Sequence, residues 1–328
     1  MNYTIFDNYP PKLLDFAVTF FLLFAVLGVT GNCITIGALC KSKKLRNATT
    51  AFIVNLCVSD ILLSGFSMPM SAVTFLERGW NYGETLCKMF PLVRYSNGAV
   101  SVFTIIAITL NRYILIVHPR IYNRVYSTRN MAIIIIMIWI ASLFLLLFPL
   151  IEVWGKLGYD PRVGTCTILI VNGKSPKITF YVAAFSIPSL VIIVCYTRIY
   201  HVVHKASKHS RNTIEMNTEC RKSENRTSHI MQYYDTLKNR FVFFYNQEKK
   251  ELKVLKIMLV LFFTFIVCYL PVSFVKIFRK EDAFPYLNVF GYLGVFFSSI
   301  INPVIYAAFS EEYKAAYKDL FCYRRIDI

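Results

Sequence analysis

Seven long apolar stretches follow one another along the chain. A helix needs about 20 apolar residues to cross the hydrocarbon core of a bilayer, so each stretch is long enough to span it. Strict apolar and polar alternation, the mark of a membrane barrel, is missing, so backbone hydrogen bonding inside lipid predicts helices. The spans are predicted over residues 16–40, 51–75, 89–117, 131–151, 178–203, 254–278 and 286–309. The predicted fold class is therefore an all-α membrane protein, a seven-transmembrane helix bundle.

Polar residues inside these spans are the first functional signal. Charged and carboxamide side chains are costly in a membrane and usually mark function. They include Asn32, Asp60, Arg94, Arg112 and Asn302. The pattern indicates a bundle with a polar interior.

Composition and charge set the orientation. Hydrophobic residues make up 56% of the 328 residues, the mean hydropathy is +0.49, and the net charge is +17. Of 36 Lys and Arg, 25 lie in or beside the loops after the first, third and fifth spans and at the C-terminal end, and ten lie on the opposite side. This asymmetry is typical of membrane topology rather than of nucleic-acid binding. It predicts a multi-pass plasma-membrane protein with an extracellular N-terminus and a cytosolic C-terminus.

The predicted organisation leaves no room for a separate soluble domain. Residues 1–15 form an extracellular N-terminus without a cleavable signal peptide, and the first span acts as signal anchor. Residues 16–309 form the membrane domain, and residues 204–250 within it form a long, polar third cytosolic loop. The loop contains the apolar segment 241–245, which extends the sixth helix or rests on the membrane surface. Residues 310–328 form a short helix and a cytosolic tail.

Cysteines and sequons agree with this topology. Seven of the nine cysteines fall in spans or on the cytosolic side, where thiols stay reduced. Only Cys87 and Cys166 face outward, and one disulfide between them is the economical assignment. The outward sequon at Asn2 predicts a glycan. The matching patterns at Asn47 and Asn225 lie on the cytosolic side and are discounted.

Short motifs recur in almost every span. Gly31-Asn32 lies in the first, Leu56 to Asp60 in the second, and Asn111-Arg112-Tyr113 at the end of the third. Trp139 lies in the fourth, Pro188 and Tyr196 in the fifth, Phe265 to Pro271 in the sixth, and Asn302-Pro303-Val304-Ile305-Tyr306 in the seventh. In this order and spacing, the set resembles rhodopsin-like (class A) G-protein-coupled receptors over almost the whole chain.

A narrower resemblance lies in three segments. They are residues 45–52, residues 111–116, and Cys166-Thr167-Ile168-Leu169 with Ser175-Pro176-Lys177. These look like the moody and trapped-in-endoderm group of arthropod orphan receptors. The resemblance implies a receptor that signals to heterotrimeric G proteins and arrestin, with roles in cell migration, polarity or barrier epithelia. The ligand and the class of G protein are not encoded in such motifs.

The resemblance assigns a role to the polar core. Asp60, Ser101 and Asn302 would form a water-filled pocket that accepts a sodium ion, and Ser298 stands where many relatives carry an asparagine. The alternative is a hydrogen-bond node that never binds an ion. No other cofactor is expected. Three prolines inside helices, Pro188, Pro271 and Pro303, favour kinks at which the helices can pivot.

The same resemblance predicts a switch at the cytosolic end. Arg112 would pair with Glu251 in the resting state, because Glu251 lies 20 residues before Pro271, the spacing of the family's acid. Tyr196 and Tyr306 would support the active form, and Tyr113 completes the motif. Asn111 departs from the family, since most relatives carry an acid there. The alternative for Glu251 is an ordinary solvated residue in a basic segment.

Two positions are expected at the ligand pocket. Tyr269 stands where many relatives have a tryptophan beneath the ligand, and Phe265 lies one turn below it. Arg94 occupies the position at which amine receptors carry an acid, so it argues against an amine and suits an anionic or lipid-like ligand. The alternative is that Arg94 reaches the outer surface or pairs with Glu152 or Glu77.

After the last span, apolar residues at three- and four-residue steps predict an amphipathic helix over residues 310–321. Cys322 follows its apolar face and is a candidate palmitoylation site, with an unmodified thiol as the alternative.

Other classes fit the sequence less well. A retinal photoreceptor needs a lysine in the seventh span, where Phe296 stands at the family position. An enzyme is not expected, because the five histidines lie at or beyond the cytosolic ends of the spans. A transporter, the second choice, would show repeats or a polar pathway.

Overall fold

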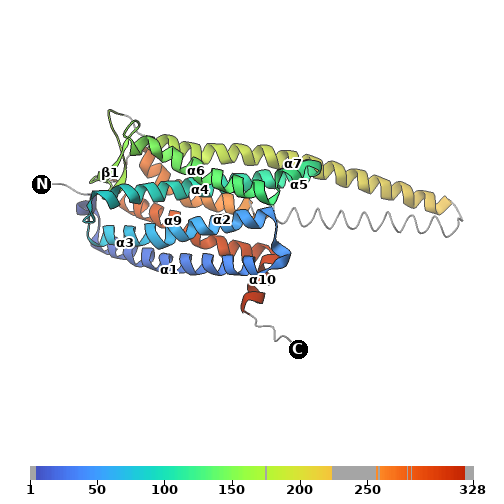
Figure 1. Cartoon of the computed structure of the whole chain (residues 1–328), viewed down its shortest axis with the longest axis horizontal. Helices are drawn as coiled ribbons and strands as arrows, with labels where there is room; N and C mark the ends of the chain where they lie inside the picture. The colour runs from blue at the N-terminus through green and yellow to red at the C-terminus, as the bar shows by residue number, and fades with distance from the viewer. Residues whose placement is uncertain are drawn as a thin grey trace.

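The computed structural model describes residues 5–173, 176–223, 256–257, 259–278, 280–281 and 283–321. Within them, seven helices are long and apolar enough to cross a membrane. They lie side by side as one elongated bundle (Figure 1). The segment 241–245, Asn2, Asn225, Glu251 and Cys322 lie outside the described residues, so the predictions made for them remain predictions.

The helices lie over the predicted spans, and most of them extend a few residues beyond the predicted bounds. The first three spans are α1 (Pro11–Lys41), α2 (Ala48–Leu62) continuing into α3 (Met68–Leu76), and α4 (Gly83–Val117). A short helix α5 (Pro119–Val125) precedes α6 (Thr128–Leu150), α7 (Lys177–Ser223) and the sixth span, Leu259–Phe278. The bundle closes with α9 (Pro285–Phe309) and α10 (Glu311–Phe321). The predicted fold class and the helix after the last span are confirmed.

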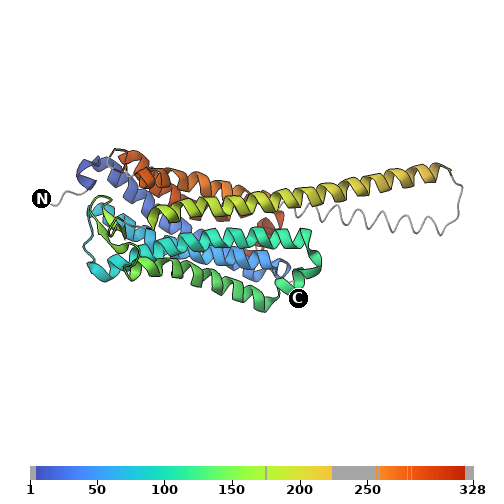
Figure 2. The ribbon, with the colours of Figure 1, turned by 90° about the horizontal axis from the view of Figure 1, so that it is seen from above.

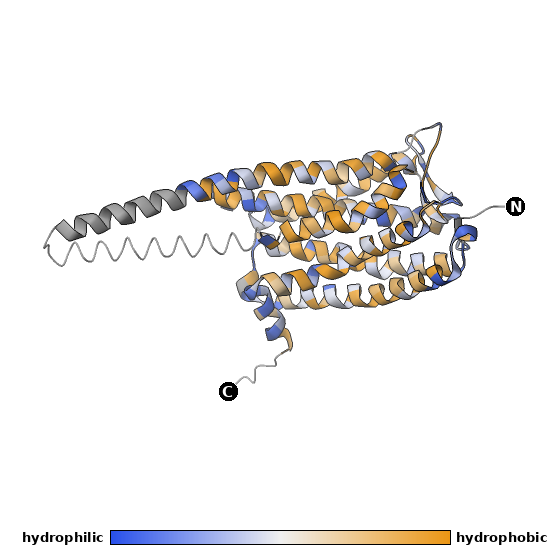
Figure 3. Ribbon diagram, turned by 180° about the vertical axis from the view of Figure 1, so that it is seen from behind, coloured by the Kyte–Doolittle hydropathy of each residue, from blue (hydrophilic) through white to orange (hydrophobic). Residues whose placement is uncertain are grey.

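The two ends of the bundle carry different elements. One end, here called the hairpin end, bears strands β1 (Lys156–Asp160) and β2 (Thr165–Leu169) and a short 3-10 turn η1 (Ile5–Asn8). The other, here called the tail end, bears α5 and α10 (Figure 1). Apolar residues dominate the ribbon between these ends, as Figure 3 shows. The sequence pattern did not predict the antiparallel hairpin, which pairs Tyr159 with Cys166.

Two helices differ from the predicted pattern. The second span contains a π-helical turn, Leu63–Ser67, followed by Pro69. Proline has no N–H to donate to the preceding turn, so the helix widens there. Helix α7 runs past residue 203 to Ser223, into the first part of the segment predicted as a loop, and projects beyond the bundle (Figure 2). Residues 189–223 contain no glycine or proline to end it.

Local capping sets where helices begin. The side chain of Asn47 accepts the backbone N–H of Thr50 at 3.0 Å and so caps α2. This residue belongs to one of the two sequons discounted from the sequence, and the cap gives it a structural role. Ser127 caps α6 in the same way, with 3.4 Å from its Oγ to the N–H of Asn130.

Helix α10 lies at the tail end and packs against α1. The hydroxyl groups of Tyr317 and Thr35 lie 2.8 Å apart. Burial raises the pKa of Tyr317 to about 12, so its hydroxyl stays protonated and able to donate. Lys41 also donates to the backbone oxygen of Asp319 at 3.2 Å. The helix is thus held against the bundle by its own polar contacts.

Candidate functional site

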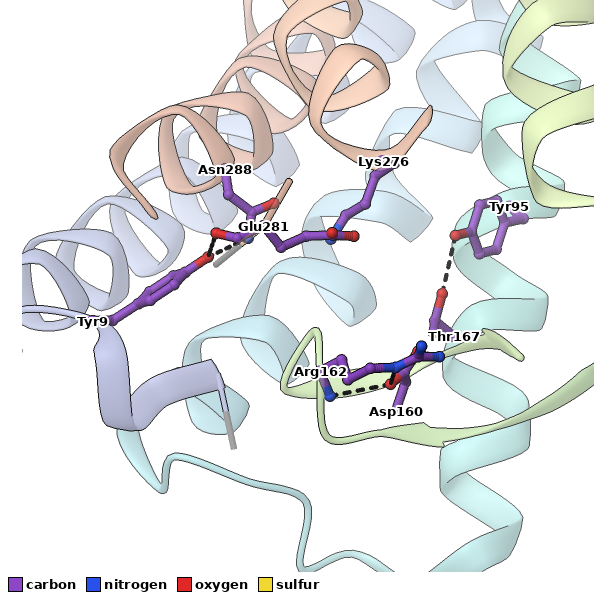
Figure 4. Close-up of polar contacts among 8 residues, drawn as sticks. All are labelled: Tyr9, Tyr95, Asp160, Arg162, Thr167, Lys276, Glu281 and Asn288. Carbon is purple, nitrogen blue, oxygen red and sulfur yellow. Dashed lines mark hydrogen bonds and ion pairs between the residues drawn. The ribbon is translucent and has the colours of Figure 1, made fainter. Parts of the chain in front are cut away.

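The β-hairpin is tied to the third span. Cys166 on β2 and Cys87 on α4 form a disulfide, with 5.3 Å between their Cα atoms. The predicted disulfide is confirmed. The Tyr95 hydroxyl on α4 lies 3.1 Å from Oγ1 of Thr167 on β2 (Figure 4). Together these contacts hold the hairpin over the hairpin end of the bundle.

A cavity of about 330 Å³ lies below the hairpin, among α4, α6, α7 and the sixth span. Its wall is mostly apolar, with Leu146, Phe185 and Val272 among the lining residues. Its polar lining residues are Arg94, Tyr95, Ser142, Thr179, Tyr181 and Tyr269. A mostly apolar cavity with a few polar groups is the usual form of a small-molecule site.

Arg94 lies on aromatic rings. Its guanidinium carbon is 4.6 Å from the ring centre of Tyr292 and 5.6 Å from that of Phe296, both on α9. Such cation–π contacts contribute about 0.5–2 kcal/mol. Within the described part of the chain, the guanidinium forms no ion pair with a carboxylate.

The alternative partners for Arg94 are engaged elsewhere. Glu77 accepts from Asn81 and from the Tyr82 hydroxyl, and Glu152 pairs with Lys156 at 2.8 Å. The alternative pairing of Arg94 with Glu77 or Glu152 is therefore wrong. The structure brings Arg94 to the cavity instead.

The predicted aromatic pair forms the cavity's lower wall. Tyr269 stacks on Phe265 with 4.2 Å between ring centres, and both line the cavity. Phe265 also meets Phe185 of α7 at 6.1 Å. The pair thus couples the sixth span to α7 directly below the cavity.

Asp60 lies in the middle of the bundle, buried on α2. Nδ2 of Asn302 donates to its Oδ2 at 2.8 Å. The hydroxyls of Ser101 and Ser298 donate to carbonyls of their own helices, those of Asn97 and Val295. Serine and carboxylate oxygens suit a hard ion such as sodium, and the sodium site stays a prediction. Among the described residues, Oδ1 of Asn32, Oγ of Ser64 and Nδ2 of Asn97 are buried without a hydrogen-bond partner, as expected where water enters a polar interior.

A second polar link was missed in the sequence. Nε1 of Trp139 donates to Oδ1 of Asn55 at 2.8 Å, and Nδ2 of Asn55 donates to Oγ1 of Thr104 at 2.8 Å. Asn55 thereby joins α2, α4 and α6. The sequence did contain an indication of this link, because Asn55 is a carboxamide inside an apolar span.

At the tail end, Asn111 takes part in a hydrogen-bonded chain. It is fully buried, accepts from Oγ1 of Thr49 at 2.9 Å, and donates from Nδ2 to the Tyr122 hydroxyl at 3.3 Å. These contacts join α2, α4 and α5. Asparagine can accept from one partner and donate to the other, so the site remains satisfied without an acid.

Arg112 lies beside Asn111 and is only 7% exposed. Tyr196 of α7 lies near enough to Arg112 to feel its charge, and it packs with Ile105 and Phe262. Tyr113 points to a different partner, with its hydroxyl 3.4 Å from Nε2 of His118. The guanidinium is therefore enclosed by the bundle.

Tyr306 completes the tail end. Its ring is 1% exposed and meets Tyr313 of α10 edge-on at 6.0 Å. Its hydroxyl is buried, and no residue in the described part of the chain forms a hydrogen bond with it. The predicted switch residues Asn111, Arg112 and Tyr306 thus lie at one end, inside the bundle.

Comparison with known proteins agrees with this geometry. Residues 31–306 match the family described as 7 transmembrane receptor (rhodopsin family). The chain is 37% identical to Protein trapped in endoderm-1 of Drosophila melanogaster, covering 95% of this chain and 79% of that protein. It is 33% identical to the G-protein coupled receptor moody of Drosophila pseudoobscura pseudoobscura over 96% of its own length. It spans about half of that receptor, 54%.

Squid rhodopsin is structurally similar to the chain. The TM-score is 0.77 at 22% sequence identity, over 95% of this chain and 86% of that one. At this identity the likeness concerns the fold.

Proposed function

We propose that this chain, which belongs to the rhodopsin family of seven-transmembrane receptors, transmits binding of an extracellular ligand to heterotrimeric G proteins. The hairpin end would face outward and the tail end the cytosol. The Lys and Arg asymmetry supports this orientation, and so does the Cys87–Cys166 disulfide, since disulfides persist on the oxidising side of the plasma membrane.

The observation that carries the proposal is the enclosed Arg112. Burying an uncompensated guanidinium is costly, so its enclosure requires compensating contacts that an opening of the tail end would exchange for others. Separation of the sixth span from α4 would expose Arg112 to a G protein, and later to arrestin. The predicted partner Glu251 belongs to the same proposal.

The ligand proposal follows from the cavity. A mostly apolar wall favours an apolar body, and the guanidinium of Arg94 at the same wall favours an anionic group. The ligand class is therefore an anionic, lipid-like molecule. Roles in cell migration, polarity or barrier epithelia remain part of the proposal.

A sodium ion would be held by Asp60, Ser101 and Asn302. It would neutralise the buried carboxylate and stabilise the resting arrangement of α2, α4 and α9. Ser298 would add a further hydroxyl oxygen, since donation to its own helix at 2.7 Å leaves its lone pairs available, as it does for Ser101.

The test is a ligand-independent coupling assay against a panel of G proteins. We expect the wild-type receptor to raise nucleotide exchange on at least one class of G protein. Arg112→Ala should abolish that signal at equal surface expression. Equal exchange by the two receptors on every class would overturn the proposal.

A further inference from the structure

A buried lysine stands at the hairpin end of the sixth span. The Lys276 side chain is 4% exposed, and its Nζ lies near the Tyr292 hydroxyl but makes no hydrogen bond of good geometry among the described residues. Its nearest carboxylate oxygen, Oε1 of Glu281, is 3.4 Å away. Charge-assisted bonds between nitrogen and oxygen usually measure about 2.7–2.9 Å, so this pair is loose. A buried ammonium held this weakly is short of negative charge.

Lys276 and Arg94 meet across one tyrosine. Nζ of Lys276 lies 5.1 Å from the ring centre of Tyr292, and the guanidinium carbon of Arg94 lies 4.6 Å from the same centre. Like charges repel strongly in a poorly hydrated interior, so this convergence favours an added anion.

Two glycines on α9 bring these groups together. A Cβ at Gly291 would lie 2.8 Å from the backbone nitrogen of Val272, and one at Gly294 would lie 2.7 Å from the carbonyl oxygen of Cys268. The close approach of α9 to the sixth span places Tyr292 beside Lys276. The position of Tyr292 beside Lys276 is therefore set by the packing of the two backbones.

The backbone at Glu281 is held by the N-terminal segment. The Tyr9 hydroxyl donates to the backbone oxygen of Glu281 at 3.2 Å and accepts from Nδ2 of Asn288 at 2.7 Å (Figure 4). Phe6 and Tyr9 are both buried against the bundle. Glu281, a loop residue, thus provides the negative charge nearest to Lys276.

We propose that Arg94 and Lys276 together bind the anionic head group of a single-chain amphiphile, and that Glu281 occupies this site until the head group replaces it. The apolar chain would fill the cavity beside Arg94. Displacing the Glu281 carboxylate would free the side-chain end of a loop whose backbone Tyr9 holds, so binding would be relayed to the N-terminal segment. This inference deepens the proposed function, on which it rests, by naming the second cation and the internal competitor.

The test compares head groups on one 18-carbon chain. Oleate, oleoyl lysophosphatidic acid, oleyl alcohol and oleylamine are added at equal mole fraction to the full-length receptor in zwitterionic nanodiscs. The readout is the thermal unfolding midpoint, measured as the mole fraction of amphiphile is increased. The mole fraction that gives half of the full rise is compared between amphiphiles. We expect a rise with one or both anions and none with the alcohol or the amine. A response to the carboxylate alone, or to the phosphate alone, identifies the head group.

Variants separate a binding site from a structural ion pair. Arg94→Gln and Lys276→Gln should each weaken the anion response by roughly tenfold or more. Lys276→Arg should retain it, which guards against a folding defect in the glutamine variant. Glu281→Gln should strengthen the anion response, because it removes the competitor. Lys280→Gln, at an exposed neighbour on the same loop, is the matched control and should change nothing.

Two results would overturn the inference. One is an equal response to the acid and the alcohol in wild type. The other is a weaker anion response in Glu281→Gln, as a purely structural pair would give. This assay contains no G protein, so a receptor that binds anions but does not couple would contradict only the proposed function.

Discussion

Asn302 donates a hydrogen bond to Asp60 at 2.8 Å and joins α9 to α2 in the middle of the bundle. The seventh span therefore holds the second through a carboxylate and a carboxamide. The predicted sodium ion would bind at this link between the two helices.

The first prediction concerns sodium. In wild type, replacing choline chloride by sodium chloride at constant ionic strength should raise the thermal unfolding midpoint. At a concentration ten times the dissociation constant, linkage contributes about 1.4 kcal/mol, or a few degrees. Asp60→Asn should remove this sodium effect while keeping a hydrogen bond to Asn302. A sodium effect of equal size in the variant would exclude Asp60 as the site.

The second prediction concerns the Cys87–Cys166 disulfide. Replacing both cysteines by serine should lower the free energy of unfolding by about 2–5 kcal/mol, because a long loop is no longer closed. Surface expression should fall as well. A membrane-impermeant maleimide on intact cells should label neither cysteine until reductant is added. Efficient labelling without reductant would show that the two thiols are free.

The third prediction concerns Asn111. Asn111→Asp should lower basal signalling, since it places a carboxylate beside Arg112 and strengthens the closed form by about 1 kcal/mol or more. One carboxylate oxygen can still accept from Thr49, and the other can accept from the Tyr122 hydroxyl, to which Asn111 now donates. Basal nucleotide exchange at equal surface expression is the measurement. Signalling that rises would show that an acid at position 111 does not restrain Arg112.

The fourth prediction concerns Glu251, which lies outside the described residues. Glu251→Ala should raise basal signalling, because the carboxylate would no longer hold Arg112 in the resting receptor. Lys249→Ala, a change in the same basic segment, serves as the control. Basal exchange that is unchanged in Glu251→Ala would remove this residue from the switch.

The fifth prediction concerns α10. Tyr317→Phe should cost about 1 kcal/mol, since it removes the hydrogen bond to Thr35. Thr35→Val should cost a similar amount, and the double variant should cost little more than either alone. Thermal unfolding of the four receptors measures this coupling. Fully additive losses would show that the two hydroxyls do not interact.

Much of the architecture is encoded locally and could be read from the sequence. Each span satisfies its own backbone hydrogen bonds, so span number depends only on apolar length. Cysteine placement relative to the membrane was enough to pair Cys87 with Cys166. The polar residues Asp60, Asn111 and Arg112 stood out because charges and carboxamides are rare inside such helices.

The sequence pattern did not predict several features that depend on more than one segment. The β-hairpin forms from two short strands that pair over the bundle, and neither has a long periodic pattern. Tyr9 contacts Glu281 and Asn288 across more than 270 residues of chain. Lys276 lay near a span end, where a lysine is ordinarily solvated, so its burial gave no signal.

The sequence by itself determined seven membrane helices, one disulfide and the polar positions within each helix. Only the tertiary structure decided which of those positions meet. Arg94, Lys276 and Tyr292 come from three helices, and Tyr292 lies beside Lys276 because Gly291 and Gly294 let α9 approach the sixth span closely. Periodicity reports the faces of one helix at a time, whereas the rotation and distance between helices depend on side-chain packing along their whole length.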